Sequence, residues 1–452
     1  MKKIKILIIG IIGSLLISCD FLDIVPDNVA TIDYAFRMRS TAEKYLSTCY
    51  SFLPQMGHVY SDIGMNGADE LWYSTTYTSV VGAQIARGEQ NVDSPIGDYW
   101  NGANSATDLW TAISQCNIFL ENIESVPDME EWEIKQWIAE VKFLKAYYHF
   151  FLLRNYGPIP VMKKNIPISA SGDEVRVYRR PVDEVFEYIV ELLDEAIVDL
   201  PEIVGDESTQ LGRITLPIAL GVKAKILVYA ASPLFNGNAD YKGFKNINES
   251  VDFFNSTYSK EKWQKAADAL KSAIDKAHSL GYKLYDFEGS LLIKEISPEL
   301  DQQMTLRNRL TERWNTEIIW ANTNSTTRHL QQWSEPKALN ESQRGYYGTS
   351  GNVGITMNMT DMFYSKNGVP IDEDITWDYN NRLNLKVGTE NEKYYIKNGY
   401  TTAAYNFDRE PRFYADLGFD GGIWFGNGNY DVKNPYWLEM KRGQFLGKYQ
   451  AG

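Results

Sequence analysis

Two segments of this sequence combine aromatic rings with polar side chains, the combination found in carbohydrate-binding sites. Sugars present C–H faces that stack on aromatic rings, and hydroxyl groups that need paired hydrogen-bond donors and acceptors. In residues 66–77 the candidate ligand contacts are Asp69, Trp72, Tyr73 and Tyr77, next to Glu70. In residues 328–347 they are Arg328, Trp333, Tyr346 and Tyr347, next to Gln331, Gln332 and Arg344. We expect the two segments to form one aromatic platform with a polar edge.

The alternative for each ring is packing beneath a long loop. Trp72 and Tyr73 fit either interpretation, whereas Gln, Ser and Gly neighbours leave little core for Trp333, Tyr346 and Tyr347 to join. Other tryptophans follow the periodicity of helices or of a strand, so we expect them in the core. These are Trp110, Trp137, Trp263 and Trp320.

Catalytic and metal-binding patterns have little support in the sequence. The histidines at 58, 149, 278 and 329 lack the spacing of a zinc site, and no glycine-rich phosphate loop precedes a helix. Residues 372–374 are three adjacent carboxylates without the glycine that a calcium loop needs, a pattern typical of a solvated loop. With 59 acidic residues, a glycosidase-like carboxylate pair stays open but nothing selects one. We predict no catalytic residue, no metal site and no cofactor.

The pattern of the N-terminal residues predicts a lipoprotein signal peptide. Lys2, Lys3 and Lys5 precede an apolar run over residues 6–17, which ends at Ser18 and Cys19. The run is too short to span a bilayer as a stable helix. We expect residues 1–18 to be removed and Cys19 to be lipidated, so that lipid chains anchor residues 19–452 to a membrane outside the cytoplasm. An ordinary signal peptide followed by an incidental cysteine is the alternative.

Composition restricts the partners and the organisation of the chain. The formal net charge of −14 argues against nucleic acid and anionic lipid as partners. Besides Cys19 only Cys49 and Cys116 remain, and the sequence leaves their pairing open. No Gly/Ser linker or charge block divides the chain, which favours one large body or closely packed subdomains.

The elements that would position the platform are mainly helices. Helical periodicity dominates residues 30–285 and predicts helices over residues 103–123, 132–155, 181–200, 215–232 and 260–280. Small residues such as Ala139, Ala146 and Ala273 would let facing helices approach closely, which resembles tetratricopeptide-like hairpins. Strict repeats are absent, so an irregular helical domain is the alternative. Residues 286–452 look loop-rich, with a buried strand at 316–322.

Six segments, in chain order, resemble the SusD/RagB family. They are residues 19–23, 117–121, 139–148 with 156–160, 179–185, 224–235 and 408–413. The resemblance implies a lipoprotein on the outer-membrane surface of Bacteroidetes-type bacteria, mainly α, with tetratricopeptide-like hairpins, an irregular loop-rich ligand-binding face and a few short strands. It implies a nutrient ligand, an oligosaccharide or polysaccharide with peptide as a possibility, and a SusC-like TonB-dependent transporter as partner.

One departure from the family pattern concerns the C-terminal end. Family members usually continue past the equivalent of residues 448–452 into another helix, which would complete the last hairpin. We therefore expect a truncated chain or a fragment, in which the apolar face over residues 263–277 is exposed.

Three functions follow from these observations. The leading one is a nutrient-binding lipoprotein that captures its ligand without cleaving it and closes over a barrel partner. The others are a surface glycoside hydrolase and a helical-repeat scaffold that binds only proteins.

Overall fold

The computed structural model describes residues 32–74, 77, 79–104, 106–289, 293, 295–336, 349–426, 430–444 and 446–448. The predicted signal peptide and lipidation site at Cys19 lie outside these ranges, as do Tyr346 and Tyr347 of the predicted platform. The fold is mainly α with a few short strands, as predicted.

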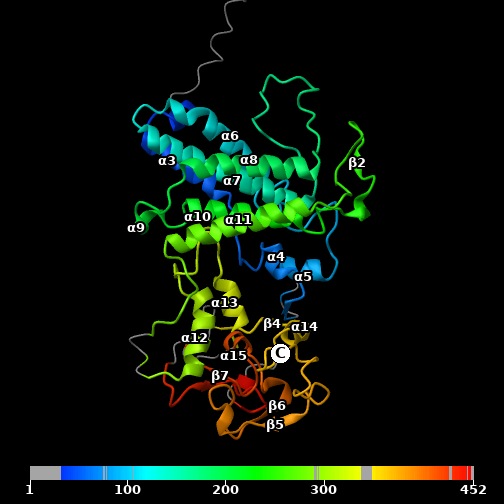
Figure 1. Cartoon of the computed structure of the whole chain (residues 1–452), viewed down its shortest axis with the longest axis vertical. Coiled ribbons are helices and arrows are strands. Elements are labelled where there is room, and N and C mark those ends of the chain that lie inside the picture. Colours follow the sequence, from blue (N-terminus) through cyan, green and yellow to red (C-terminus); the bar gives the residue numbers. More distant parts are fainter. Residues whose placement is uncertain are drawn as a thin grey trace, which may run out of the picture.

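One half of the molecule is a layer of long helices, in the upper part of Figure 1. Its helices are α2 (Ile32–Ala35), α3 (Arg39–Ser51), α6 (Leu109–Asn122), α7 (Glu131–Tyr156), α8 (Val182–Asp199), α9 (Glu207–Gln210), α10 (Leu216–Ala231) and α11 (Lys260–Ser279). Each of the long helices packs on the next one along the chain, from α6 onward. None of the helices in the described ranges has the length and apolarity needed to cross a lipid bilayer.

The predicted helices are confirmed, with one boundary corrected. Helix α6 begins at Leu109 rather than near residue 103, because the Asp108 side chain caps it by accepting a hydrogen bond from the Thr111 amide at 2.9 Å. Helix α7 is the centre of the layer, and its Trp137, Tyr148 and Leu152 are fully buried. The thiols of Cys49 in α3 and Cys116 in α6 are buried and free.

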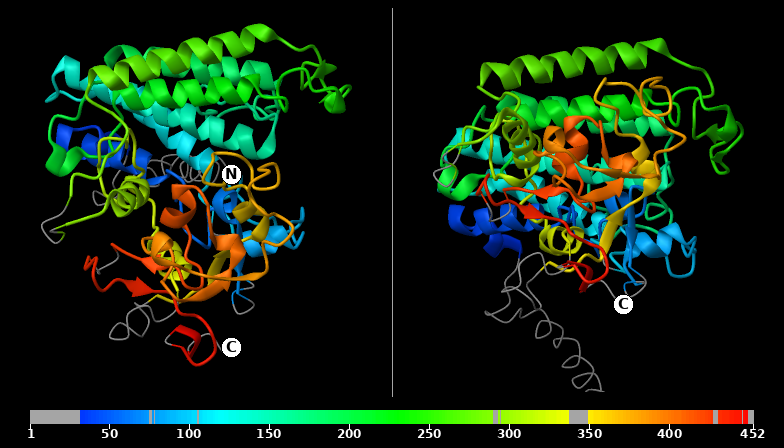
Figure 2. Two further views of the ribbon diagram at one scale, coloured as in Figure 1. Left: turned by 60° about the horizontal axis from the view of Figure 1, so that its bottom comes forward. Right: turned by 90° about the horizontal axis from the view of Figure 1, so that it is seen from below.

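Helix α11 forms the outer edge of the layer in both views of Figure 2. It contacts α10 through its small residues Ala266, Ala273 and Ala277, which are buried. Its large apolar residues point outward, so Trp263 is 40% exposed and the prediction of a core position for it is wrong. The other three tryptophans expected in the core are buried or half-buried against it.

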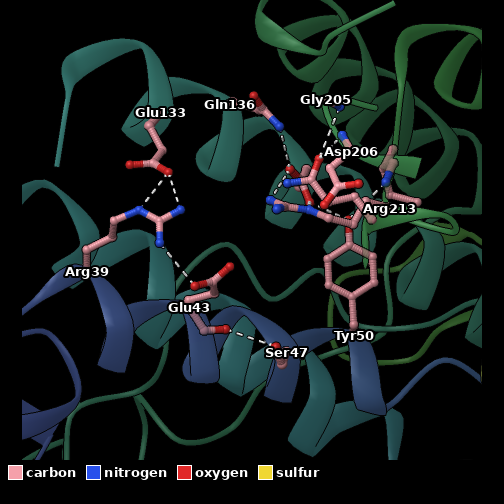
Figure 3. A network of polar contacts seen from close by, with 12 residues as sticks. Arg39, Glu43, Ser47, Tyr50, Glu133, Gln136, Gly205, Asp206 and Arg213 are labelled. Carbon is pink, nitrogen blue, oxygen red and sulfur yellow. Dashed lines mark hydrogen bonds and ion pairs between the residues drawn. The ribbon is translucent and has the colours of Figure 1, made fainter. Parts of the chain in front are cut away.

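A carboxylate with no access to water connects three elements of the helical layer. Glu140 in α7 is fully buried, and its Oε1 accepts a hydrogen bond from Arg213 Nη2 at 2.6 Å. Its Oε2 accepts from the Tyr50 hydroxyl at 2.5 Å, and that hydroxyl in turn accepts from the Ile214 amide. The side chains of Tyr50, Gln136 and Arg213 converge at this point (Figure 3). Burial and the adjacent Glu140 raise the Tyr50 pKa well above its usual value.

The other half combines short helices with two-stranded antiparallel ladders. Its helices are α12 (Pro298–Thr311), α13 (Arg328–Ser334), α14 (Met357–Asp361) and α15 (Pro411–Asp416), while α4 (Ile63–Asn66) and α5 (Val81–Ala86) lie between the halves (Figure 1). The ladders pair β1 (Leu71–Tyr73) with β4 (Val353–Ile355), β2 (Lys245–Asn246) with β3 (Val251–Asp252), β5 (Leu385–Val387) with β6 (Thr401–Ala403), and β7 (Ile423–Trp424) with β8 (Tyr436–Trp437). The β2–β3 ladder belongs to a hairpin of the helical half.

The prediction of a buried strand at residues 316–322 is wrong. This segment is irregular and half-buried, with Ile319 and Trp320 packed on the helical core. Side-chain hydrogen bonds replace a ladder: the Asn315 side chain accepts from the nearby Glu317 amide, and the Asn322 side chain donates to the carbonyl of Pro54, which is distant in the sequence. Asparagine side chains compete with strand pairing in this way.

Arg409 is the buried cation at the centre of the loop-rich half. Its guanidinium donates to the carbonyl oxygens of Thr360, Phe363 and Tyr405 at 2.8–3.1 Å. It also lies 4.3 Å from the centre of the Phe413 ring. Burial lowers its pKa. Residues 408–413, one of the segments that carry the family resemblance, therefore organise this half.

We predict that Glu140→Ala strongly destabilises the helical half, because it leaves Arg213 without its partner in a mostly buried position. Breaking a buried ion pair costs about 3–5 kcal/mol. The change is measured as the free energy of unfolding by circular dichroism. Glu131→Ala, which removes the exposed pair with Lys135 on the same helix, should cost at most about 0.5 kcal/mol. Equal losses in the two variants would contradict the role given to Glu140.

We also predict acid sensitivity from His149, which is fully buried in α7. Its Nδ1 lies 2.8 Å from the Lys145 carbonyl and its Nε2 accepts from the Met162 amide, so the neutral ring fits this position. Burial lowers its pKa from 6.5 to about 4. Its contribution, about 3 kcal/mol, is present above pH 6.5 and is lost as the pH falls toward 4.

The measurement is the free energy of unfolding between pH 7 and 4, compared with His149→Gln. The variant should lose less stability over this range than the parent does. His278→Gln on the exposed side of α11 is the matched control and should behave as the parent. A His149→Gln profile parallel to that of the parent would refute the assignment.

Candidate functional site

Residues 66–77 and the described part of the second predicted segment, residues 328–336, lie together in the structure. Strand β1 pairs antiparallel with β4, so that Leu71 faces Ile355, Trp72 faces Gly354 and Tyr73 faces Val353. The pairing continues beyond the ladder: the Ser74 amide donates to the Asn352 carbonyl at 2.8 Å. Helix α13, which carries Arg328 and Trp333, contacts β4. A short two-stranded ladder therefore joins residues that are far apart in the sequence.

A hydrogen-bonded turn supports the inner side of this ladder. Asp62 caps α4 by accepting from the Met65 amide, and Asn66 at the end of that helix accepts from the Tyr73 hydroxyl at 2.7 Å. Gly82 in α5 packs directly on Asn66, since a Cβ atom at position 82 would lie 1.8 Å from the Asn66 carbonyl oxygen. Burial raises the pKa of Tyr73, which stays a neutral donor. The strand is thus held in a fixed orientation.

The aromatic rings on the inner side form a small core. Tyr77 and Trp333 lie 4.3 Å apart between ring centres, and Tyr60 meets Trp333 edge-on at 5.8 Å. Trp333 is only 7% exposed and Tyr73 is also buried. For these two residues the packing interpretation therefore fits the structure better than direct ligand contact.

The outer side of the ladder presents one large ring to solvent. Trp72 is 55% exposed, and its cross-strand partner is Gly354. A Cβ atom at position 354 would meet nothing within 4 Å, so the space beside the indole is open. Asp69, three residues before Trp72 in the sequence, is exposed, and its carbonyl accepts from the Thr356 hydroxyl, which fixes the start of the strand. The outer face can stack a flat apolar surface against Trp72.

The other residues predicted to contact the ligand differ in their exposure to solvent. Tyr77 is half-buried at the border of the inner cluster, and Arg328 is exposed at the start of α13. Tyr346 and Tyr347 lie outside the described residues. The structure therefore leaves Asp69, Trp72, Tyr77 and Arg328 as the predicted residues that solvent can reach.

Two histidines that are far apart in the sequence meet under the platform. The ring centres of His58 and His329 lie 6.3 Å apart, and both contact Tyr60. Burial, assisted by His329, lowers the pKa of His58. Within the described ranges, no group of three His, Cys, Asp or Glu side chains could hold a metal ion.

The three adjacent carboxylates at residues 372–374 do not form a uniformly solvated loop. Asp372 and Glu373 are exposed, but Asp374 is buried. The Asp374 carboxylate accepts hydrogen bonds from Ser365, Asn367 and Thr376, which hold its pKa well below its usual range. Protein donors thus occupy the oxygens that a calcium ion would need.

A polar cavity of about 380 Å³ lies next to the turn that carries Ser61, and sequence reasoning missed it. Its lining residues come from four separate parts of the chain: Ser51, Leu53, Gln55, Ser61, Tyr99, Ala106, Thr107 and Asn324. These residues have no shared periodicity or motif. Only the abundance of Asn, Gln and Ser in loops could have suggested a polar recess.

Two protein-family models match separate parts of this chain. Residues 20–228 match a SusD-like family described as starch-binding and associating with the outer membrane, and residues 316–451 match the SusD family. A SusD-like protein of Bacteroides ovatus is 24% identical over 253 residues, which are 53% of this chain and 42% of that protein. The match thus spans less than half of the length of this curated relative.

Solved structures share the fold. BT4246 is 27% identical, with a TM-score of 0.73, and the match covers 89% of this chain and 68% of BT4246. A SusD-like protein of Bacteroides fragilis, BF3747, is 18% identical, with a TM-score of 0.60 and coverage of 93% and 69%. At that identity the second likeness concerns the fold alone.

The geometry predicts different roles for the two tryptophans. Trp333→Ala should lower the free energy of unfolding by about 3–5 kcal/mol, because it removes a large ring from the inner cluster. Trp72→Ala should change stability by less than about 0.5 kcal/mol, because half of its surface is already in water. Denaturant unfolding of both variants against the parent measures this difference. If Trp72→Ala proved as damaging as Trp333→Ala, the outward position of Trp72 would be refuted.

Proposed function

This chain belongs to the SusD/RagB family, and on that premise we propose that it captures a glycan at the outer membrane without cleaving it. The proposal includes a lipid anchor at Cys19, orientation toward the cell exterior, and delivery of the ligand to a SusC-like TonB-dependent transporter. The description of the matched family as starch-binding and associated with the outer membrane supports it.

The single observation that carries this proposal is the exposed Trp72 beside the open space at Gly354. A pyranose ring has a flat C–H face of similar size to an indole, and a glycine in the opposite strand leaves room for it. The fixed strand holds the indole in one orientation before the ligand arrives, which lowers the entropy cost of binding. Asp69, and Arg328 on α13, supply an acceptor and a donor for sugar hydroxyls.

The position of the ladder supports delivery as well as capture. Strand β1 follows α4, which lies between the helical layer and the loop-rich half (Figure 1), and pairs with β4 of the loop-rich half. Trp72 on its outer face is 55% exposed, so a long chain ligand can lie across it. A site of this type suits a polymer whose ends extend beyond the protein and reach a second protein.

We predict that Trp72→Ala weakens binding of the cognate glycan at least about tenfold, because stacking on one ring contributes about 1.4 kcal/mol or more. Isothermal calorimetry against plant, host and microbial polysaccharides measures the affinity, and chromatography of the recovered ligand tests whether it is unchanged. Gly354→Val should weaken binding similarly by filling the space beside the indole.

The matched control is Trp132→Ala, which removes a 65% exposed tryptophan from the start of α7. It should bind as the parent does. Unchanged affinity in both Trp72→Ala and Gly354→Val would refute this site, and the appearance of new reducing ends would favour a hydrolase instead.

A further inference from the structure

The polar cavity beside Ser61 is separate in sequence from the platform around Trp72. Its described lining residues come from the segment after α3, the segment before α6 and the segment before α13, and none of them belongs to residues 66–77 or 328–347. Its volume of about 380 Å³ lies at the small end of the range for small-molecule sites, about 300–1,000 Å³. The cavity therefore has room for a small ligand.

The chemistry of the lining restricts what that ligand can be. None of the described lining residues is charged: the polar ones are Ser, Thr, Gln and Asn, and the others are Leu53, Ala106 and Tyr99. Hydroxyls and amides both donate and accept hydrogen bonds, as sugar hydroxyls do. A charged group would lose its hydration here without meeting an opposite charge. The lining therefore matches an uncharged, hydroxyl-rich ligand and disfavours a uronic acid, a sulfate or an amine.

The carboxylates next to the lining in sequence are already bound by protein donors. Asp62 accepts hydrogen bonds from the amides of Gly57 and Met65. Asp108 accepts from the amide and the hydroxyl of Thr111. Neither aspartate lines the cavity. The protein therefore uses these two charges to shape the surrounding turns, and the lining stays neutral.

Hydrogen bonds between segments fix the walls of the cavity before a ligand arrives. The Asn324 side-chain amide donates to the carbonyl oxygens of Ser51 and Leu53 at 3.2 and 3.4 Å. The Tyr99 hydroxyl donates to the Ser61 carbonyl at 2.9 Å. A preformed cavity loses little conformational entropy when it binds a small molecule. The recess is therefore a built feature of the fold.

Two polar groups of the lining are available to a ligand. In the part of the chain that the structure describes, neither the Gln55 side-chain amide nor the Thr107 hydroxyl has a hydrogen-bond partner. The amide can donate and accept, and the hydroxyl can do either. A sugar in the cavity would satisfy both groups.

The cavity and the platform share one turn of the chain. Ser61 lines the cavity, while the preceding residue, Tyr60, meets Trp333 of the inner cluster edge-on at 5.8 Å. Each place is therefore fixed in position relative to the other.

We propose that the polar cavity binds a short uncharged stretch of the glycan ligand, as a second subsite besides Trp72. This inference rests on the proposed function, because it takes the ligand to be a glycan. It adds the chemical class: the residues that enter the cavity are neutral sugars, whereas uronic-acid and sulfated residues are excluded. A peptide is the less suitable occupant, since Leu53 and Ala106 offer little apolar surface for its side chains.

The test uses the full chain and probes that are matched except for their charge. They are the methyl glycosides of glucose, galactose and mannose, each beside its uronic acid, and the peptide Gly-Ser-Gly blocked at both ends. Titration by saturation-transfer NMR measures each affinity. At least one neutral glycoside should bind, and its uronic acid should bind at least about tenfold more weakly, because its charge finds no partner in the cavity.

Two variants place this binding in the cavity. Thr107→Val removes one hydroxyl at nearly constant shape and should weaken the neutral glycoside at least about threefold, the effect of losing one hydrogen bond. Ala106→Trp fills the cavity and should abolish binding. Thr257→Val, at an exposed threonine of the helical half, is the matched control and should bind as the parent does. Circular dichroism verifies that each variant is folded.

The inference and the proposed function fail in different ways. Glycoside binding that is lost in Trp72→Ala but kept in Thr107→Val and Ala106→Trp would overturn the cavity subsite alone. So would the absence of binding by every neutral glycoside, equal binding of the uronic acids, or binding of the peptide in their place. Failure of the proposed function shows instead as unchanged polysaccharide affinity in Trp72→Ala and Gly354→Val.

Discussion

The Glu140 carboxylate is fully buried, and the helical layer around it supplies the hydrogen-bond donors that replace its hydration. A buried charge is tolerated only when partners replace its hydration. Here the partners come from α3 and from the segment before α10, so α7 can keep this charge only while both neighbours stay in place. Apolar packing alone would allow the helices to slide along one another. The buried pair fixes their register, and with it the positions of the turns that leave the layer.

The helices could be predicted from the sequence because their signals are local. Periodicity located α7, α8, α10 and α11 within a few residues, and prolines and glycines marked their ends. Prediction failed where an outcome depended on distant neighbours. Within the described residues, 316–322 have the apolar composition of a strand but pair with no strand, and Trp263 follows helical spacing on α11, which packs on α10 through its small residues.

The candidate site was predictable in composition but not in geometry. Segments 66–77 and 328–347 were expected together; within the described residues, Tyr77 packs on Trp333, and α13 contacts β4, which pairs with β1. Strand alternation then directs Trp72 outward and Tyr73 inward, a distinction that requires knowledge of which face is covered. The same dependence explains why Trp333, which has polar neighbours in sequence, is buried. Whether these residues contact a ligand stays a prediction.

The ladder between β1 and β4 can form only late in the synthesis of the chain. Asp69 and Thr356, which meet at its edge, are separated by 287 residues. Most of the polypeptide must be synthesised before the second strand exists, and closing so long a loop is slow compared with forming helical hairpins. The helical layer can thus assemble during synthesis while the outer aromatic face is absent. A nascent or partly folded molecule would therefore lack the finished β1–β4 ladder that presents Trp72.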